Sequence, residues 1–184
     1  MTEEIIIAGF GGQGVLSMGK ILAYSAVIQG MEVSWMPAYG PEMRGGTANV
    51  TVIISSEKIS SPIVRYFDTA IILNQQSLDK FEQFVKPGGI LIYDNNGITR
   101  HPVRTDISIY NIDATEEAHR LNNSKVFNMV ALGGFLKLKP VVTLENVVEG
   151  LKESMHRYPD LLAKNEQALL RGAEIITEVS KAKA

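Results

Sequence analysis

The sequence predicts a single α/β domain with three layers, α/β/α, around a mostly parallel sheet with a Rossmann-like start. Short apolar runs rich in β-branched residues alternate with helical patterns, which is typical of parallel strands buried on both faces. After Asp113 the pattern becomes helical. The 184 residues show no repeat, no low-complexity tract and no linker. One domain over residues 1–184 is therefore the simplest interpretation.

The first expected unit is a strand, a helix and a second strand. Ile5 to Gly9 is a short apolar run typical of a central parallel strand. Val15 to Ile28 is expected to form a helix that ends near Gly30, because small and apolar residues recur there at helical spacing. Met31 to Met36 is the second strand candidate. A unit of this length favours a right-handed parallel crossover.

The later elements are predicted from the same two patterns, short apolar runs for strands and helical spacing of apolar residues for helices. Strand-forming runs predict further strands over Thr47–Ser55, Asp68–Asn74, Gly89–Tyr93 and Ser108–Ile112. A short helix over Gln75–Val85 is expected to end at the turn Lys86-Pro87-Gly88-Gly89. Helical patterns then cover Thr115–Leu121, Val126–Leu138, Leu144–Met155 and Leu161–Val179. The last of these carries one apolar face along its whole length.

Composition excludes several classes of function. The net charge of -2 gives no basic face for nucleic acid. The chain has no cysteine, which removes disulfides, thiolate catalysis and Cys-ligated zinc or iron–sulfur clusters from this chain. The acidic start Met1-Thr2-Glu3-Glu4 is unlike a signal peptide, and no apolar segment approaches the ~20 residues that cross a bilayer. We expect a cytoplasmic chain with neither a nucleic-acid nor a membrane partner.

The histidines offer no metal or catalytic site. His101, His119 and His156 are far apart, and none has a carboxylate or a second histidine in a convincing metal-ligand arrangement. We interpret all three as surface residues, and no catalytic residue is predicted in this chain.

A glycine-rich loop follows the first strand. Gly9, Gly11 and Gly14 fit the G-x-G-x-x-G pattern between a strand and a helix, where helix amides can bind an anion. A dinucleotide site also needs an acidic residue at the end of the second strand. That strand ends Ser34-Trp35-Met36-Pro37, and Glu32 lies at its start. Three interpretations stay open: a dinucleotide site, another anion site, or glycines that only permit tight packing.

A second loop, Pro37 to Gly46, is dense in special residues. Tyr39, Glu42 and Arg44 offer a phenol, a carboxylate and a guanidinium. The simpler interpretation is an exposed Glu42–Arg44 ion pair, and the functional one has Arg44 bind an anion bidentately. If both loops follow parallel strands, both lie at the carboxyl edge of the sheet, where open α/β folds bind ligands. The candidate binding residues are Gly9, Gly11, Gly12, Gln13, Gly14, Tyr39, Glu42, Arg44, Gly45 and Gly46. Gln13 could contact a ligand or a partner chain, or it could cap its own turn.

These motifs together resemble a known family. Gly-Phe-Gly-Gly-Gln-Gly at 9–14, followed by Tyr-Gly-Pro-Glu-Met-Arg-Gly-Gly-Thr-Ala-Asn at 39–49, is similar to the gamma subunit of 2-oxoacid:ferredoxin oxidoreductases. Further matching segments are Ser61-Pro62 before Asp68, Lys86-Pro87-Gly88-Gly89, Asn128 to Gly133, and Asn165 with Gly172. The resemblance covers nearly the whole chain. It implies one gamma-type domain over residues 1–184.

The resemblance also implies an activity that this chain would share with partners. Such complexes convert a 2-oxoacid, coenzyme A and oxidised ferredoxin into an acyl-CoA, carbon dioxide and reduced ferredoxin. It implies alpha and beta subunits with thiamine diphosphate and magnesium, and iron–sulfur clusters on beta or a ferredoxin-like delta subunit. The gamma subunit would help to form the coenzyme A site and would bind no cofactor alone. The Tyr39 to Ala48 motif looks more like 2-oxoglutarate and branched-chain members than pyruvate members, and we favour 2-oxoglutarate.

Two other classes of function stay open, as does a homodimer of the isolated chain. A free-standing nucleotide-binding oxidoreductase is motivated by Gly9, Gly11 and Gly14. A scaffold subunit without a ligand would use both loops only for protein contacts.

Overall fold

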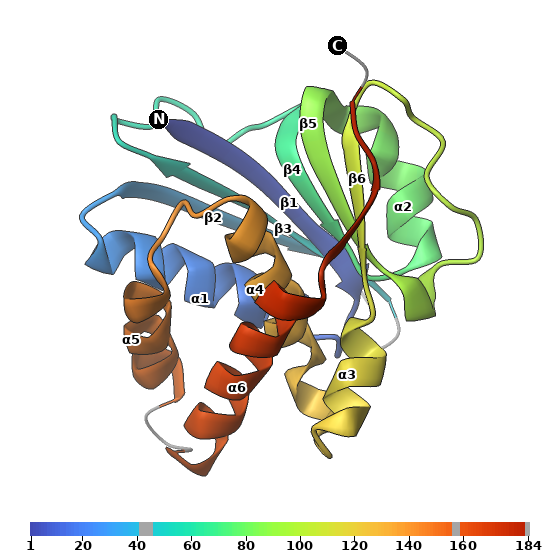
Figure 1. Ribbon diagram of the computed structural model, residues 1–184. Helices are drawn as coiled ribbons and strands as arrows, with labels where there is room; N and C mark the ends of the chain where they lie inside the picture. The colour runs from blue at the N-terminus through green and yellow to red at the C-terminus, as the bar shows by residue number, and fades with distance from the viewer. Residues whose placement is uncertain (41–45, 156–158, 183–184) are drawn as a thin grey trace.

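The computed structural model describes residues 1–40, 46–155 and 159–182. In this part of the chain one seven-stranded sheet has helices on both faces, as the sequence predicts (Figure 1). The strand order is β2-β3-β1-β4-β5-β6-β7. The strands are β1 (Thr2–Phe10), β2 (Glu32–Tyr39), β3 (Thr47–Ser55), β4 (Phe67–Ile72), β5 (Val85–Asp94), β6 (Ser108–Ile112) and β7 (Thr177–Ser180). The helices are α1 (Val15–Ile28), α2 (Gln75–Phe81), α3 (Ala114–Arg120), α4 (Phe127–Leu138), α5 (Leu144–Met155) and α6 (Pro159–Ile175).

The centre of the sheet is parallel, whereas both ends are antiparallel. Strands β1, β4, β5 and β6 pair in parallel, as expected. Strand β3 pairs antiparallel with both β1 and β2, and β7 pairs antiparallel with β6. Strand β2 therefore runs in the same direction as β1, but β3 lies between them. The start is Rossmann-like in its order of elements, and the inserted β3 separates its first two strands.

Alternating residues of the buried strands enter two separate cores. In β1, Ile5 and Ile7 face the larger core with α1, α4, α5 and α6, whereas Ile6 and Ala8 face the smaller core with α2. Figure 1 shows α1, α4, α5 and α6 on one side of the sheet and α2 on the other. Burial on both faces explains why these strands read as continuous apolar runs.

Helices α4 and α6 touch through their backbones. A methyl group on Gly133 would overlap the carbonyl oxygen of Leu169, and one on Gly172 would overlap that of Val130. Only glycine allows this approach at either position. Gly133 and Gly172 belong to the segments that carry the family resemblance, and their role here is packing.

Several boundaries differ from the sequence prediction, and three of the largest differences arise where pairing between distant segments overrides local pattern. Strand β2 continues to Tyr39 through Pro37, which an edge strand tolerates because its outer amides need no partner. Strand β5 begins at Val85, and the helix before it ends at Phe81 with a 3₁₀ turn over Glu82–Phe84. The final helix forms but ends at Ile175, and its expected extension to Val179 is wrong because residues 177–180 pair with β6 as β7.

Among the described residues, none of the helices combines the length and the apolar character that crossing a membrane requires.

Candidate site at the carboxyl edge of the sheet

The two predicted loops lie at one edge of the sheet. Antiparallel pairing sets Phe10 at the end of β1 opposite Thr47 in β3, and Tyr39 at the end of β2 opposite Ala48. The Gly11 amide donates a hydrogen bond of 2.8 Å to the carbonyl oxygen of Gly46. The sequence prediction that both loops meet at the carboxyl edge is therefore confirmed for the described residues.

The glycines of the first loop have different roles. A methyl group on Gly9 would lie 2.6 Å from Oε1 of Gln13, and one on Gly14 would overlap Nδ2 of Asn128. Both positions are closely packed. Gly12 has φ +98°, and a methyl group placed on it would meet no atom within 4 Å, so its backbone faces open space. The loop thus contains two glycines that packing requires, Gly9 and Gly14, and one with an accessible backbone, Gly12.

The Gln13 side chain bonds within the protein. Its Oε1 accepts a hydrogen bond of 2.6 Å from the Phe10 amide, and its Nε2 donates one of 3.3 Å to the carbonyl oxygen of Leu73. These bonds close the glycine loop and attach it to the end of β4. The geometry favours the turn-capping interpretation of Gln13.

Helix α1 begins at this edge with amides that have no hydrogen-bond partner among the described residues. Its first backbone hydrogen bond runs from the Met18 amide to the Gly14 carbonyl, so the amides of residues 15–17 precede the helical ladder. Gly14 caps the helix without a side chain, and the first turn contains no acidic residue. The positive end of the helix dipole attracts anions, and no described side chain caps it.

The second strand does not place an acid where a dinucleotide site needs one. Glu32 pairs with Ser55, which in turn pairs with Thr2 at the start of β1. The Glu32 carboxylate therefore lies at the opposite end of the sheet from the glycine loop. This geometry argues against the nicotinamide or flavin dinucleotide interpretation.

Two hollows flank the glycine loop. One, of about 440 Å³, lies between the loop, the end of β2 and the start of β3, and the largely exposed Tyr39 forms part of its wall. The other, of about 480 Å³, lies between the loop and the start of α4, and its polar lining residues are Gln13, Ser17, Asn123, Ser124, Lys125, Asn128 and Asn165. The amides before Met18 lie between the two hollows. The sequence did not predict that residues 123–128 line the second hollow, because they are far from both glycine loops in the chain.

Three of the candidate residues, Glu42, Arg44 and Gly45, lie outside the described residues. The Glu42–Arg44 ion pair and the anion-binding role of Arg44 stay predictions. Gly46 is described, and its carbonyl fixes the start of β3 to the first loop.

Two further polar residues lie at the ends of β4 and β5. Asp94 is buried, and the Thr115 hydroxyl donates a hydrogen bond of 2.5 Å to its carboxylate. Burial raises the pKa of Asp94, and hydrogen bonds from Thr115, Asn96 and Ala114 oppose that rise. Asn74, also buried, caps α2 through its Oδ1, which accepts a hydrogen bond from the Ser77 amide. Both side chains fix the starts of helices at this edge.

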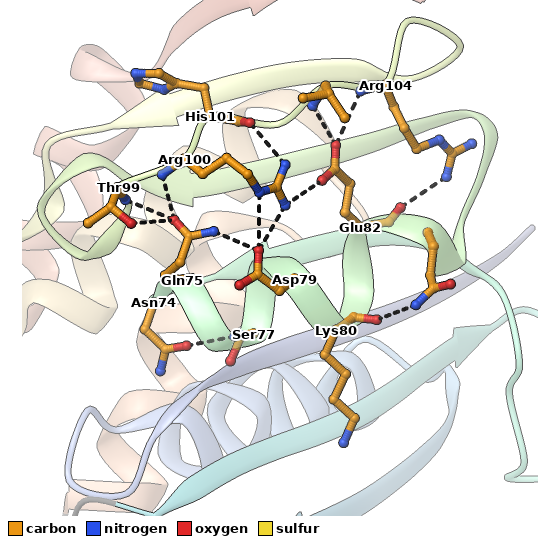
Figure 2. A network of polar contacts seen from close by, with 12 residues as sticks. Asn74, Gln75, Ser77, Asp79, Lys80, Glu82, Thr99, Arg100, His101 and Arg104 are labelled. Carbon is orange, nitrogen blue, oxygen red and sulfur yellow. Dashed lines mark hydrogen bonds and ion pairs between the residues drawn. The ribbon is translucent and has the colours of Figure 1, made fainter.

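Figure 2 shows a polar network between α2 and the segment 99–104. The buried carboxylate of Glu82 accepts hydrogen bonds from the Val103 and Arg104 amides and from the Arg100 guanidinium. The hydrogen bond from Arg100 also lowers the pKa of Asp79 below its usual value. Strong bonds of this kind attach the segment to the smaller core. The network begins at Gln75, directly after Asn74, and has a structural role.

The histidines fit the surface interpretation where they are described. His101 and His119 are exposed, and Nδ1 of His101 lies 3.2 Å from the Tyr93 hydroxyl. His156 lies outside the described residues. The described part of the chain contains no group of three or more His, Asp or Glu residues that could hold a metal ion.

Comparison with known proteins identifies relatives along the whole domain. Residues 4–175 match the family model described as pyruvate ferredoxin/flavodoxin oxidoreductase. The chain is 40% identical to the ketoisovalerate oxidoreductase subunit VorA of Methanothermobacter thermautotrophicus, over 93% of this chain and 36% of that protein. It is 32% identical to the 2-oxoglutarate synthase subunit KorC of Methanocaldococcus jannaschii, over 97% of this chain and 96% of that protein. The chain thus spans about a third of the VorA relative and nearly all of KorC.

A solved structure shares the fold. It is a 2-oxoglutarate:ferredoxin oxidoreductase from Magnetococcus marinus with 2-oxoglutarate, coenzyme A and succinyl-CoA bound. The match has a TM-score of 0.86 at 27% identity, over 97% of this chain and 32% of that one. Here too, the domain is one part of a longer chain.

Proposed function

Because the chain belongs to the pyruvate ferredoxin/flavodoxin oxidoreductase family, we propose that it is the gamma subunit of a thiamine diphosphate-dependent 2-oxoglutarate:ferredoxin oxidoreductase. The complex would convert 2-oxoglutarate, coenzyme A and oxidised ferredoxin into succinyl-CoA, carbon dioxide and reduced ferredoxin. The observation that carries the proposal is the match to the Magnetococcus marinus enzyme over 97% of this chain. The end-to-end match to KorC supports the same assignment.

The chain needs partners for the redox chemistry. Thiamine diphosphate supplies the decarboxylation chemistry, and iron–sulfur clusters carry electrons to ferredoxin. The sequence contains no cysteine to ligate a cluster. We propose that the clusters lie on a beta or a ferredoxin-like delta subunit, and that alpha and beta subunits bind thiamine diphosphate and magnesium. The isolated chain should have no activity.

The glycine-loop edge is suited to help bind coenzyme A. Coenzyme A carries a pyrophosphate and a 3′-phosphate, and the open amides at the start of α1 can bind such an anion without any side chain. The bare backbone of Gly12 allows a close approach, and the Tyr39 ring offers an apolar wall. Arg44 would supply the bidentate cation. Gln13 would act by holding the loop, since its amide bonds to Phe10 and Leu73.

The relatives differ in the 2-oxoacid that their names give. KorC matches this chain along nearly its full length, which favours 2-oxoglutarate, whereas the more identical VorA favours ketoisovalerate. The Tyr39 to Ala48 motif resembles both types and is less like pyruvate members.

The test is to purify the chain with the proteins that accompany it in its source and to assay viologen reduction by the complex. We expect CoA-dependent activity that is greatest with 2-oxoglutarate, compared with 2-oxoisovalerate and pyruvate at equal concentrations. A preference for 2-oxoisovalerate would reassign the substrate. A chain recovered without thiamine-binding or cluster-bearing partners would refute the subunit assignment.

The open alternatives need their own measurements. Calorimetric titration of the chain with NAD, NADP and FAD should give no binding heat, because β2 carries no acid at the end where the ribose would lie. Binding of any of these dinucleotides would instead support the hypothesis of a free-standing oxidoreductase. CoA protection of the glycine loops against hydrogen exchange in the complex would reject the ligand-free scaffold.

A further inference from the structure

The neighbouring parallel strands β1 and β4 end side by side at the carboxyl edge of the sheet. After β1 the chain enters α1 on one face, and after β4 it enters α2 on the other face (Figure 1). Along the chain, β1 is followed by β2 towards one end of the sheet, and β4 by β5 towards the other. Open α/β sheets bind ligands at such a point, and the G-x-G-x-x-G pattern sets the pyrophosphate of a dinucleotide there. We call Phe10, Leu73 and Asn74, at these two strand ends, the β1–β4 junction.

The Gln13 side chain lies across this junction. Its Oε1 accepts the hydrogen bond of 2.6 Å from the Phe10 amide at the end of β1, and its Nε2 donates the one of 3.3 Å to the Leu73 carbonyl oxygen just after β4. A methyl group on Gly9 would lie 2.6 Å from the same Oε1 and 3.1 Å from Cβ of Leu73. One carboxamide therefore bridges the two strand ends and is closely packed between them.

A buried amide at the junction lacks an acceptor. Asn74 is 3% exposed, and its Nδ2 donates a hydrogen bond to no described residue. The parallel pairing of Ala8 with Ile72 sets Asn74 level with Phe10. Its Oδ1 caps α2, and Figure 2 shows its amide nitrogen pointing away from Ser77. A buried donor without an acceptor is costly, which indicates that an acceptor atom such as a phosphate oxygen would suit this place.

The junction also lies beside the start of α1. Gln13 directly precedes Gly14, whose backbone caps the helix, and the first turn contains no acidic residue. A phosphate at the junction would be stabilised by the positive end of the helix dipole. It would also accept a hydrogen bond from the Phe10 amide, which now donates to Gln13. The strand ends thus offer donors for a phosphate, and the Gln13 carboxamide lies among them.

We propose that Gln13 is a specificity-determining residue, whose side chain occupies the β1–β4 junction and excludes the pyrophosphate of a dinucleotide. This exclusion adds to the effect of the acid that β2 lacks, because it acts on the phosphates and not on the ribose. A phosphate bound at the glycine loop then enters from one of the two hollows that flank the loop. The inference goes beyond the proposed function, because it concerns a class of ligand that the domain rejects.

The test compares the full wild-type chain with two variants, and inorganic pyrophosphate is the probe. Pyrophosphate carries no ribose, so the missing acid on β2 cannot affect the result. Gln13→Ala removes the carboxamide and vacates the junction. The matched control, Gln13→Met, removes the hydrogen bonds but keeps a side chain of similar length. In ¹H–¹⁵N spectra, the Leu73 and Asn74 amides of Gln13→Ala should shift saturably, with an affinity at least about tenfold above that of wild type or Gln13→Met.

Thermal melting shows whether each variant folds. If Gln13→Ala does not fold, Gln13→Asn replaces it, because that amide is one methylene too short to reach both partners and should also admit pyrophosphate. Wild-type shifts at Leu73 and Asn74 as tight as those of the shortened variant would overturn the proposal, as would a shortened variant that shows none. Equal binding by Gln13→Met would overturn it too, because a loosened loop and not the vacated space would then admit the ion. These outcomes are measured on the chain alone, so they are separate from the CoA dependence that tests the proposed function.

Discussion

At the scale of single residues, the glycine loop separates two kinds of glycine. Gly9 and Gly14 are packed against Gln13 and Asn128, so a side chain at either would disrupt the loop itself. Gly12 has open space around it. Glycine is favoured there by backbone conformation alone, since φ is +98°. Gly12 is therefore the position at which ligand contact can be measured apart from packing.

Gly12→Ala should destabilise the chain by about 1 kcal/mol through the unfavourable positive φ. If coenzyme A passes over Gly12, the added methyl group should also raise the CoA concentration that half-saturates the complex. Gly30→Ala is the matched control, because Gly30 has φ +80°, equally open space, and a position at the other end of α1. Equal melting temperatures with a CoA effect only for Gly12 would support the site. An unchanged CoA requirement would remove Gly12 from it.

Arg44→Ala tests the cation that the sequence predicts at the same edge. Loss of a charge-assisted contact to a phosphate should weaken CoA binding by about 1–3 kcal/mol, while the complex still assembles. Arg65→Ala is the control, since Arg65 is exposed and precedes β4, at the opposite edge of the sheet. Steady-state titration of CoA measures the effect. Equal CoA dependence in the two variants would reject the role of Arg44.

At the scale of elements, the sequence predicts the bounds of those helices and strands that depend on residues close together in the chain. The bounds of α1, α5, β3 and β6 agree with the sequence prediction. Strand β7 could not be predicted, because it forms only by pairing with β6, and Thr177–Ser180 continues an apolar helical pattern. Residues 123–128, which line the hollow beside α4, could not be predicted as part of the site for the same reason, because they meet the glycine loop only in the folded structure. The sequence alone leaves the role of Gln13 open, because its partner, Leu73, is 60 residues away.

The contact between α4 and α6 gives a prediction about elements. Gly172→Ala would place a methyl group on the Val130 carbonyl, so the two helices must move apart. Overpacking of this kind costs about 1–3 kcal/mol, although alanine favours a helix more than glycine does. Chemical denaturation should show the loss. Gln167→Ala, an exposed change on the same helix, should leave stability unchanged or slightly raised. A stable Gly172→Ala would mean that the helices do not touch there.

At the scale of the whole molecule, charged pairs join the helical layer across long sequence distances. The buried carboxylate of Glu117 on α3 accepts a hydrogen bond of 2.8 Å from Arg171 on α6, and it also pairs with Arg120. The hydrogen bond from Arg171 is the main cause that lowers the pKa of Glu117 below its usual 4.5. The pair attaches α3 to the helix that packs on α4. Its stability contribution therefore depends on pH.

The sign of that dependence follows from the lowered pKa. A carboxyl group with a lower pKa in the folded state stabilises the fold at pH values above its unfolded pKa, and the contribution is lost as pH falls through the folded value. Glu117→Gln should therefore destabilise the protein by about 1–2 kcal/mol at pH 7. The difference from wild type should shrink as pH falls below about 4.5. Glu57→Gln, which changes an exposed carboxylate, should lack this pattern. Unfolding free energies of the three proteins between neutral and acidic pH decide the matter, and a constant difference across that range would show that Glu117 does not stabilise the fold as a charged group.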